Sequence, residues 1–126
     1  MTLVFGGAYQ GKLDYVMERF GLTDGDVFCC SEEDMSLPQG KRAVNGLDKW
    51  LLALVKGGGD VSGMMAEFIE KNGRAVVICN DVSCGVVPAD YDMRRWRETV
   101  GRAMVELSRA SEETIRLFCG IPTKVR

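Results

Sequence analysis

A glycine-rich turn ending in Gly-Lys is the clearest chemical signal in this sequence of 126 residues. It follows the pattern G-x-x-x-x-G-K after an apolar strand and before a helix, which is typical of a phosphate-binding loop. Backbone N–H groups of such a loop hold phosphate oxygens, and its lysine reaches the terminal phosphates. We therefore predict that a nucleotide or another phosphorylated small molecule binds here. The predicted binding residues are Gly6, Gly7, Ala8, Gly11 and Lys12.

The residue after the lysine departs from this pattern. Leu13 stands where a serine or threonine hydroxyl would hold Mg²⁺, so the loop keeps its phosphate donors and loses a metal ligand. Asp81, just past a buried strand, is expected to be the remaining carboxylate on the metal side, and Lys12 and Asp81 are the predicted catalytic residues. The alternative for the loop is a plain strand-turn-helix. For Asp81 it is a side chain that caps a turn beside Asn80.

Histidine is absent, which excludes catalysis and metal sites that depend on imidazole. Five cysteines without a C-x-x-C pair argue against a disulfide framework and suit a reducing compartment. Cys29, Cys30 and Cys84 could converge as a thiol or metal site, although free cysteines more often act as small buried hydrophobes.

The composition predicts one domain over residues 1–126, with an apolar fraction of 46% and a net charge of −2. No global positive charge is present to attract a nucleic acid. Apolar runs such as residues 51–55 are too short to span a membrane, and the Met1 end lacks the regions of a signal peptide. We therefore predict a cytoplasmic protein with neither a nucleic acid nor a membrane as partner.

Hydrophobic periodicity predicts alternating strands and helices. The expected strands are residues 2–5, 27–30, 74–79 and 114–119. The expected helices are residues 12–20, 47–56, 62–72 and 91–110. Residues 31–42 are interpreted as loop, and Gly73 as a left-handed helix cap.

This alternation predicts an α/β fold of three layers, of the P-loop NTPase (RecA-like) type, with a small and mainly parallel sheet. Ligands bind such sheets at the carboxyl ends of the strands. Four groups of unusual residues fall at those ends: residues 6–12, 29–30, 80–81 and 119–120.

The remaining chemical candidates have simpler structural interpretations. The arginines of the last helix are expected to form a solvated charged face, with phosphate contact as the alternative. Trp50 and Trp96 lie on apolar helical faces and are expected in the core. The arginines in question are Arg94, Arg95, Arg97 and Arg102.

Several motifs together resemble the cobinamide kinase/cobinamide phosphate guanylyltransferase family of cobalamin biosynthesis. After the phosphate loop come a central block and a block that follows Asp81, and the arginine helix and a closing Gly120-Ile121-Pro122 stand in the family's order. The two blocks read Val44-Asn45-Gly46-Leu47-x-x-Trp50-Leu51 and Asn80-Asp81-Val82-x-x-Gly85-Val86-Val87-Pro88.

The resemblance implies a kinase that phosphorylates the aminopropanol hydroxyl of adenosylcobinamide with a nucleoside triphosphate, ATP or GTP, and Mg²⁺. It also implies transfer of GMP through a guanylylated histidine, which this chain lacks. The segment between Cys30 and Val44 is shorter than in the family. The family also has a serine at the position of Leu13 and a glutamate at the position of Asp81. By analogy with family members, a homo-oligomer is expected.

The sequence thus favours a nucleotide-binding relative of cobinamide kinase that has lost guanylyl transfer and retains weak kinase activity or none. One alternative is a working NTP-dependent cobinamide kinase. The other is a non-enzymatic role, either as a partner subunit or through a cysteine-based site.

Overall fold

The computed structural model describes residues 1–7, 11–82 and 90–126. Six strands form one sheet in the order β2-β3-β4-β1-β5-β6. All paired strands run parallel except β5 and β6, which are antiparallel. The strands are β1 (Thr2–Gly6), β2 (Val27–Cys29), β3 (Ala43–Asn45), β4 (Val76–Asn80), β5 (Glu113–Phe118) and β6 (Ile121–Lys124).

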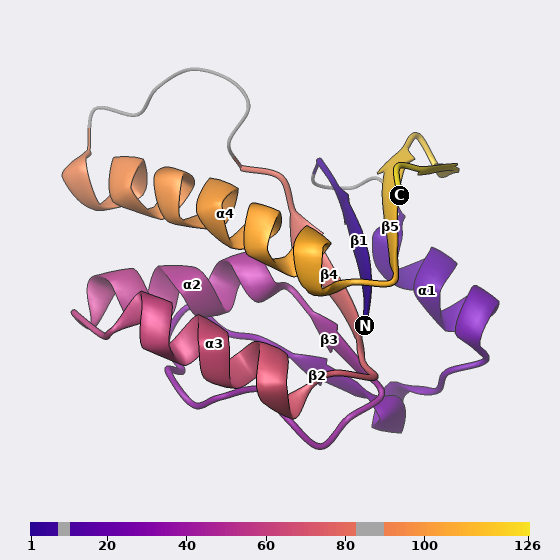
Figure 1. The fold of residues 1–126 in the computed structure, drawn as a ribbon, viewed down its shortest axis with the longest axis horizontal. Helices are drawn as coiled ribbons and strands as arrows, with labels where there is room; N and C mark the ends of the chain where they lie inside the picture. The colour runs from indigo at the N-terminus through magenta and orange to yellow at the C-terminus, as the bar shows by residue number, and fades with distance from the viewer. Residues whose placement is uncertain (8–10, 83–89) are drawn as a thin grey trace.

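Helices cover both faces of the sheet and make three layers (Figure 1). α1 (Lys12–Phe20) lies on one face, and α2 (Leu47–Lys56), α3 (Val61–Lys71) and α4 (Tyr91–Ala110) lie on the other. A short 3-10 turn, η1 (Asp24–Asp26), precedes β2. The fold is therefore the predicted α/β architecture of the P-loop type.

Alternation along the central strands supplies a core for each face. Leu3 of β1 packs in the cluster with Trp50 and Leu107 from the helices α2 and α4, whereas the neighbouring Val4 packs with Val16 of α1. In β4, Val77, Ile78 and Cys79 are all buried, as expected for a parallel strand covered on both sides. The two central strands, β1 and β4, thus contribute side chains to the apolar cores on both faces of the sheet.

Two strands were not predicted from the sequence. β3 has only three residues, too few for an alternating pattern to emerge. β6 follows a turn of two residues, Cys119 and Gly120, which both have positive φ (50° and 74°) as in a tight hairpin. β6, which contains Pro122, forms the outermost strand of the sheet.

The prediction that Gly73 caps the second of the central helices in the left-handed conformation is wrong. The helix α3 ends at Lys71, and Asn72 is its cap with a φ of −119°. The buried Asn72 amide donates to the carbonyl oxygens of Pro38 and Phe68, both at 2.9 Å. The end of α3 is therefore capped by Asn72, whose side-chain amide binds a helix carbonyl oxygen, and not by a left-handed glycine.

The other predicted elements agree with the structure to within two residues, and residues 31–42 contain neither helix nor strand. Within the described ranges, no helix is both long enough and apolar enough to cross a membrane.

Candidate functional site

The carboxyl ends of β1 and β4 lie side by side and bring two predicted site segments together. Gly6 is paired with Asn80 in the register of the two strands. The backbone N–H of Asp81 donates to the carbonyl oxygen of Gly6 at 2.7 Å. The start of the phosphate loop, residues 6–12, is therefore fixed directly against the segment that carries the predicted metal-side carboxylate.

Glycine is required at Gly6 and at Gly11 for different structural reasons. Gly6 has a φ of +157°, and a Cβ atom there would lie 2.3 Å from the carbonyl oxygen of Leu117 in β5. Gly11 has a φ of +80° with open space around it, and it is the residue from which α1 begins. Gly6 is thus required by close backbone approach, and Gly11 by its left-handed conformation. Of the predicted binding residues, Ala8 lies outside the described residues.

Lys12, the first residue of α1, is buried with 6% of its surface exposed. Its Nζ donates to the carbonyl oxygen of Gly7 at 2.5 Å, so the ammonium group lies over the beginning of the loop. Burial lowers the pKa of Lys12, while the negative charge of Asp48 acts in the opposite direction. A buried cation at the start of a helix is suited to bind an anion.

Asp48, in the first turn of α2, belongs to this site and was missed by the sequence analysis. Only 3% of its surface is exposed. Its carboxylate oxygens accept hydrogen bonds from the backbone N–H of Asn80 at 3.1 Å and from the Asn80 side-chain amide at 3.3 Å. An aspartate in the first turn of a helix usually compensates the helix dipole at the surface, so nothing in the sequence distinguished Asp48 from that case.

Leu13, which replaces the serine or threonine of the loop pattern, has apolar surroundings. This side chain packs against the apolar cluster beneath α1 and offers no oxygen ligand. Asp81 is the predicted carboxylate, and it makes a further interaction with its surroundings. Across residues 1–7, 11–82 and 90–126, no group of three or more His, Cys, Asp or Glu side chains is arranged to hold a metal ion.

A family model for cobinamide kinase / cobinamide phosphate guanyltransferase matches residues 49–125. The chain belongs to this family. The matched region includes Asp81, α4 and the closing hairpin, while the phosphate loop and Asp48 precede it. No curated protein matches the chain. Membership in the cobinamide kinase family supports a function related to cobalamin biosynthesis, and this family uses a nucleoside triphosphate.

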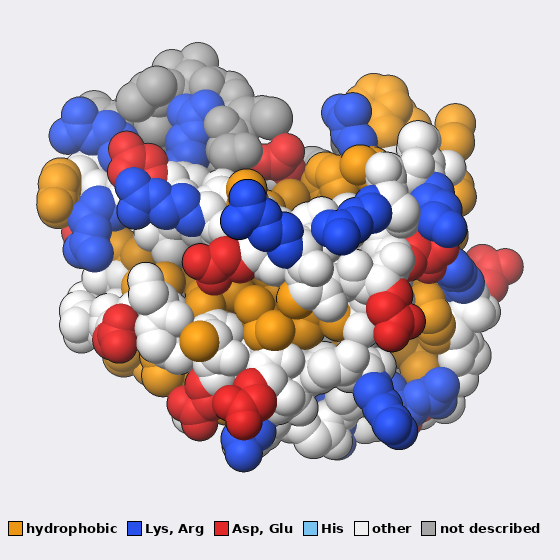
Figure 2. Space-filling model, viewed as in Figure 1, with side chains coloured by type: hydrophobic (Ala, Val, Ile, Leu, Met, Phe, Trp, Pro, Cys, Tyr) orange, Lys and Arg blue, Asp and Glu red, His pale blue; other side chains and the backbone are white. Residues whose placement is uncertain are grey.

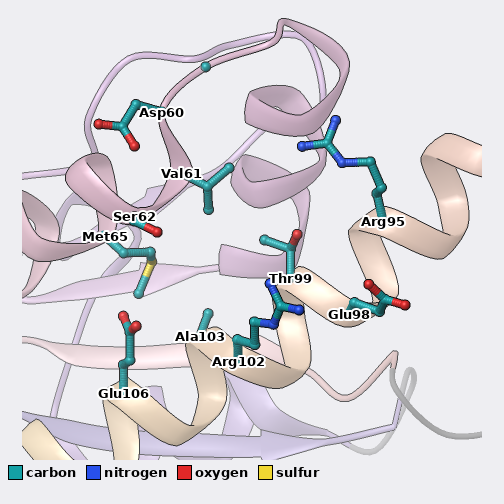
Figure 3. Close-up of a pocket in the computed structure, with 11 residues that line it drawn as sticks. Asp60, Val61, Ser62, Met65, Arg95, Glu98, Thr99, Arg102, Ala103 and Glu106 are labelled. Atoms are coloured by element: carbon teal, nitrogen blue, oxygen red, sulfur yellow. The ribbon is translucent and has the colours of Figure 1, made fainter.

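A hollow within the family-matched region lies away from the phosphate loop. It has a volume of about 300 Å³ and lies between the start of α3 and the helix α4 (Figure 3). Arg95 and Arg102 line it together with Glu98 and Glu106. Neither Asp81 nor the described residues of the phosphate loop are among its lining residues. Figure 2 shows a band of Lys and Arg side chains over α4. Arg94, Arg95 and Arg102 are exposed, as in the predicted solvated face, whereas Arg97 is half-buried.

The tryptophans also follow the structural interpretation. Trp50 is buried and packs against the ring of Phe68, with 5.4 Å between the ring centroids. Trp96 is half-buried, and its indole N–H donates to the backbone carbonyl oxygen of Asp48 at 2.7 Å. Trp96 therefore connects α4, which lies within the region matched by the cobinamide kinase family, to the start of α2.

The cysteines differ widely in their surroundings. Cys29 is exposed at the end of β2, whereas Cys79 is fully buried in β4. Burial and the charge of Asp48 raise the pKa of Cys30 to about 12, which keeps this thiol protonated at neutral pH. Cys84 lies outside the described residues, so the three-cysteine hypothesis stays a prediction. The surroundings of Cys30 favour a neutral thiol over a thiolate ligand.

Proposed function

We propose that this member of the cobinamide kinase family binds the triphosphate of ATP or GTP in the loop Gly6–Lys12. The observation that carries the proposal is the position of Lys12, buried at the start of α1 with its ammonium group over Gly7. Because Gly11 provides no side-chain cap, the first N–H groups of α1 have no side-chain acceptor there. Phosphate oxygens would accept hydrogen bonds from these groups and from Lys12.

The proposed chemistry excludes guanylyl transfer. That reaction of the cobinamide kinase family proceeds through a histidine, and this chain contains none. Kinase activity is proposed to be weak or absent, because Leu13 supplies no hydroxyl for Mg²⁺ and Asp81 would hold the ion with water and phosphate oxygens. The phosphate acceptor, where transfer occurs, would be the hydroxyl group of a corrinoid.

The test is calorimetric titration of the protein with GTP and with ATP, each with and without Mg²⁺. We expect binding of both nucleotides, reduced about a hundredfold in Lys12→Ala, since a buried charge-assisted contact is lost. Lys56→Ala, at the end of α2, is the matched control and should bind as the wild type does. Equal affinities for wild type and Lys12→Ala would contradict the proposal.

A working cobinamide kinase is the second candidate, and the contact between the Asp81 backbone and Gly6 favours it. This contact holds the carboxylate-bearing residue beside the loop, as metal-assisted phosphoryl transfer requires. An assay with cobinamide, GTP and Mg²⁺ distinguishes the two candidates. Turnover that is abolished by Asp81→Asn would favour the kinase, and nucleotide binding without turnover would favour the binding protein.

A further inference from the structure

The carboxylate of Asp48 is the buried acid at the meeting point of three elements. It lies in the first turn of α2 and accepts two hydrogen bonds from Asn80 at the end of β4. The backbone of the same residue accepts the hydrogen bond from Trp96 of α4. The start of α2 is further held by a 3.1 Å hydrogen bond from the backbone N–H of Gly46 to the carbonyl oxygen of Ile78. Asp48 therefore cannot move without moving the end of β4.

The end of β4 in turn determines where the phosphate loop begins. Asn80 is paired with Gly6, and the next residue, Asp81, donates its backbone N–H to the Gly6 carbonyl oxygen. Gly7 follows and accepts the hydrogen bond from Lys12. A continuous set of contacts thus leads from the carboxylate of Asp48 to the ammonium group of Lys12.

Asp48 is also the charge that acts most widely in this part of the molecule. Burial lowers the pKa of Lys12, and the negative charge of Asp48 acts against that decrease. Burial raises the pKa of Cys30 and of Cys79, and the charge of Asp48 adds to both increases. A buried ammonium group is stable as a cation only when a negative charge compensates the loss of water. Besides Asp48 of α2, Lys12 interacts electrostatically with Cys79 of β4. Burial raises the pKa of Cys79 and keeps that thiol neutral, so Asp48 supplies the negative charge.

We propose that Asp48 is a positioning residue of the phosphate loop, which fixes the end of β4 through Asn80 and supplies the negative charge that balances Lys12. The inference rests on the proposed function in so far as the loop binds phosphate. Asp48 touches neither phosphate nor metal in this assignment. It acts through Lys12 and Asn80, and it maintains a cationic loop before any ligand arrives.

The decisive experiment follows the titration of Lys12 by NMR of protein labelled with ¹³C-lysine, without any ligand. Lys12→Arg identifies the resonance. In Asp48→Asn the titration midpoint of Lys12 is expected to move to lower pH, because the balancing charge is gone while the side-chain shape is kept. Asp14→Asn is the matched control, since it removes an exposed carboxylate from the first turn of the helix that carries Lys12. An unchanged midpoint in Asp48→Asn would overturn the proposal.

A second measurement uses inorganic triphosphate as the probe. Because a neutral amine no longer attracts phosphate, Asp48→Asn should lose about tenfold or more in affinity between pH 7 and pH 9 relative to wild type. A pH dependence identical to that of wild type would count against the inference. Absence of triphosphate binding by wild type would instead refute the proposed function and leave the ligand-free titration as the test of Asp48.

Asn80→Ala is the substitute where Asp48→Asn does not fold. It keeps the carboxylate and removes the side-chain amide that donates at 3.3 Å. A positioning role predicts weaker triphosphate binding with an unchanged Lys12 titration. Wild-type affinity in Asn80→Ala would contradict that role.

Discussion

The carboxyl ends of β1 and β2 carry reactive side chains at the same edge of the sheet, yet their surroundings differ. β1 is a central strand, flanked by β4 and β5, and its end leads into α1 with Lys12 buried. β2 is an outermost strand of the sheet, beyond β3, and its last residue, Cys29, is exposed. Position in the sheet, more than residue type, thus determines where charges and backbone donors can converge into a site.

The largest effect expected from this comparison concerns the thiols at the end of β2. The pKa of Cys30 is raised from 9.0 to about 12, so its thiolate fraction near neutral pH is lower by about a thousandfold than that of an ordinary thiol. Cys29, which is exposed, should be alkylated by iodoacetamide first. Mass spectrometry of partly labelled protein at pH 8 measures the difference.

The rate at Cys30 should rise with pH throughout the range from 7 to 10, because its thiol loses the proton only near pH 12. Cys29→Ser isolates this reaction. A Cys30 rate that levels off below pH 9 would mean that the end of β2 is a second activated site, and the contrast with β1 would fail.

The next effect concerns the glycines of the phosphate loop. Gly6→Ala should lower the free energy of unfolding by about 3 kcal/mol, because its Cβ would overlap the Leu117 carbonyl oxygen and the backbone must move. Gly11→Ala should cost only about 1 kcal/mol, the penalty for a left-handed alanine with open space around it. Urea denaturation measures both. Equal losses would show that β5 does not constrain the end of β1.

The smallest effect is expected from restoring the hydroxyl. Leu13→Ser should make GTP binding about three- to tenfold tighter in Mg²⁺ than without it, since one metal ligand is regained. The leucine packs against the core beneath α1, so a loss of stability of about 1 kcal/mol should accompany the gain. Leu13→Ala, with the same truncation and no hydroxyl, is the control. Identical Mg²⁺ dependence in both variants would remove the metal argument.

The sequence was sufficient for the elements whose patterns are long. α4 was predicted with its observed bounds, Tyr91–Ala110, because its apolar residues recur at helical spacing over many turns. The strand β4 was recognisable because a strand buried on both faces is continuously apolar. The sequence predicted that residues 6–12 and 80–81 lie at one edge of a parallel sheet, whereas the pairing of Gly6 with Asn80 came from the structure.

The rest depended on contacts between distant residues. β3 is a strand because Ala43–Asn45 lies between β2 and β4, and three residues carry no period of their own. Asp48 is buried and accepts hydrogen bonds from Asn80, which lies 32 positions further along the chain. Asn72 replaces Gly73 as the helix cap because the Pro38 carbonyl oxygen lies within its reach. Each of these depends on tertiary structure, which local propensity does not encode.

The hairpin that completes the sheet has a consequence for how the protein behaves at high concentration. Pro122 has no N–H group, and such a residue is accommodated in a strand where its nitrogen faces away from the neighbouring strand. Any chain that attempted to extend the sheet at β6 would find a missing donor, with the charge of Lys124 nearby. We expect β6 to resist growth of the sheet from one molecule to the next, and so to disfavour aggregation by strand addition.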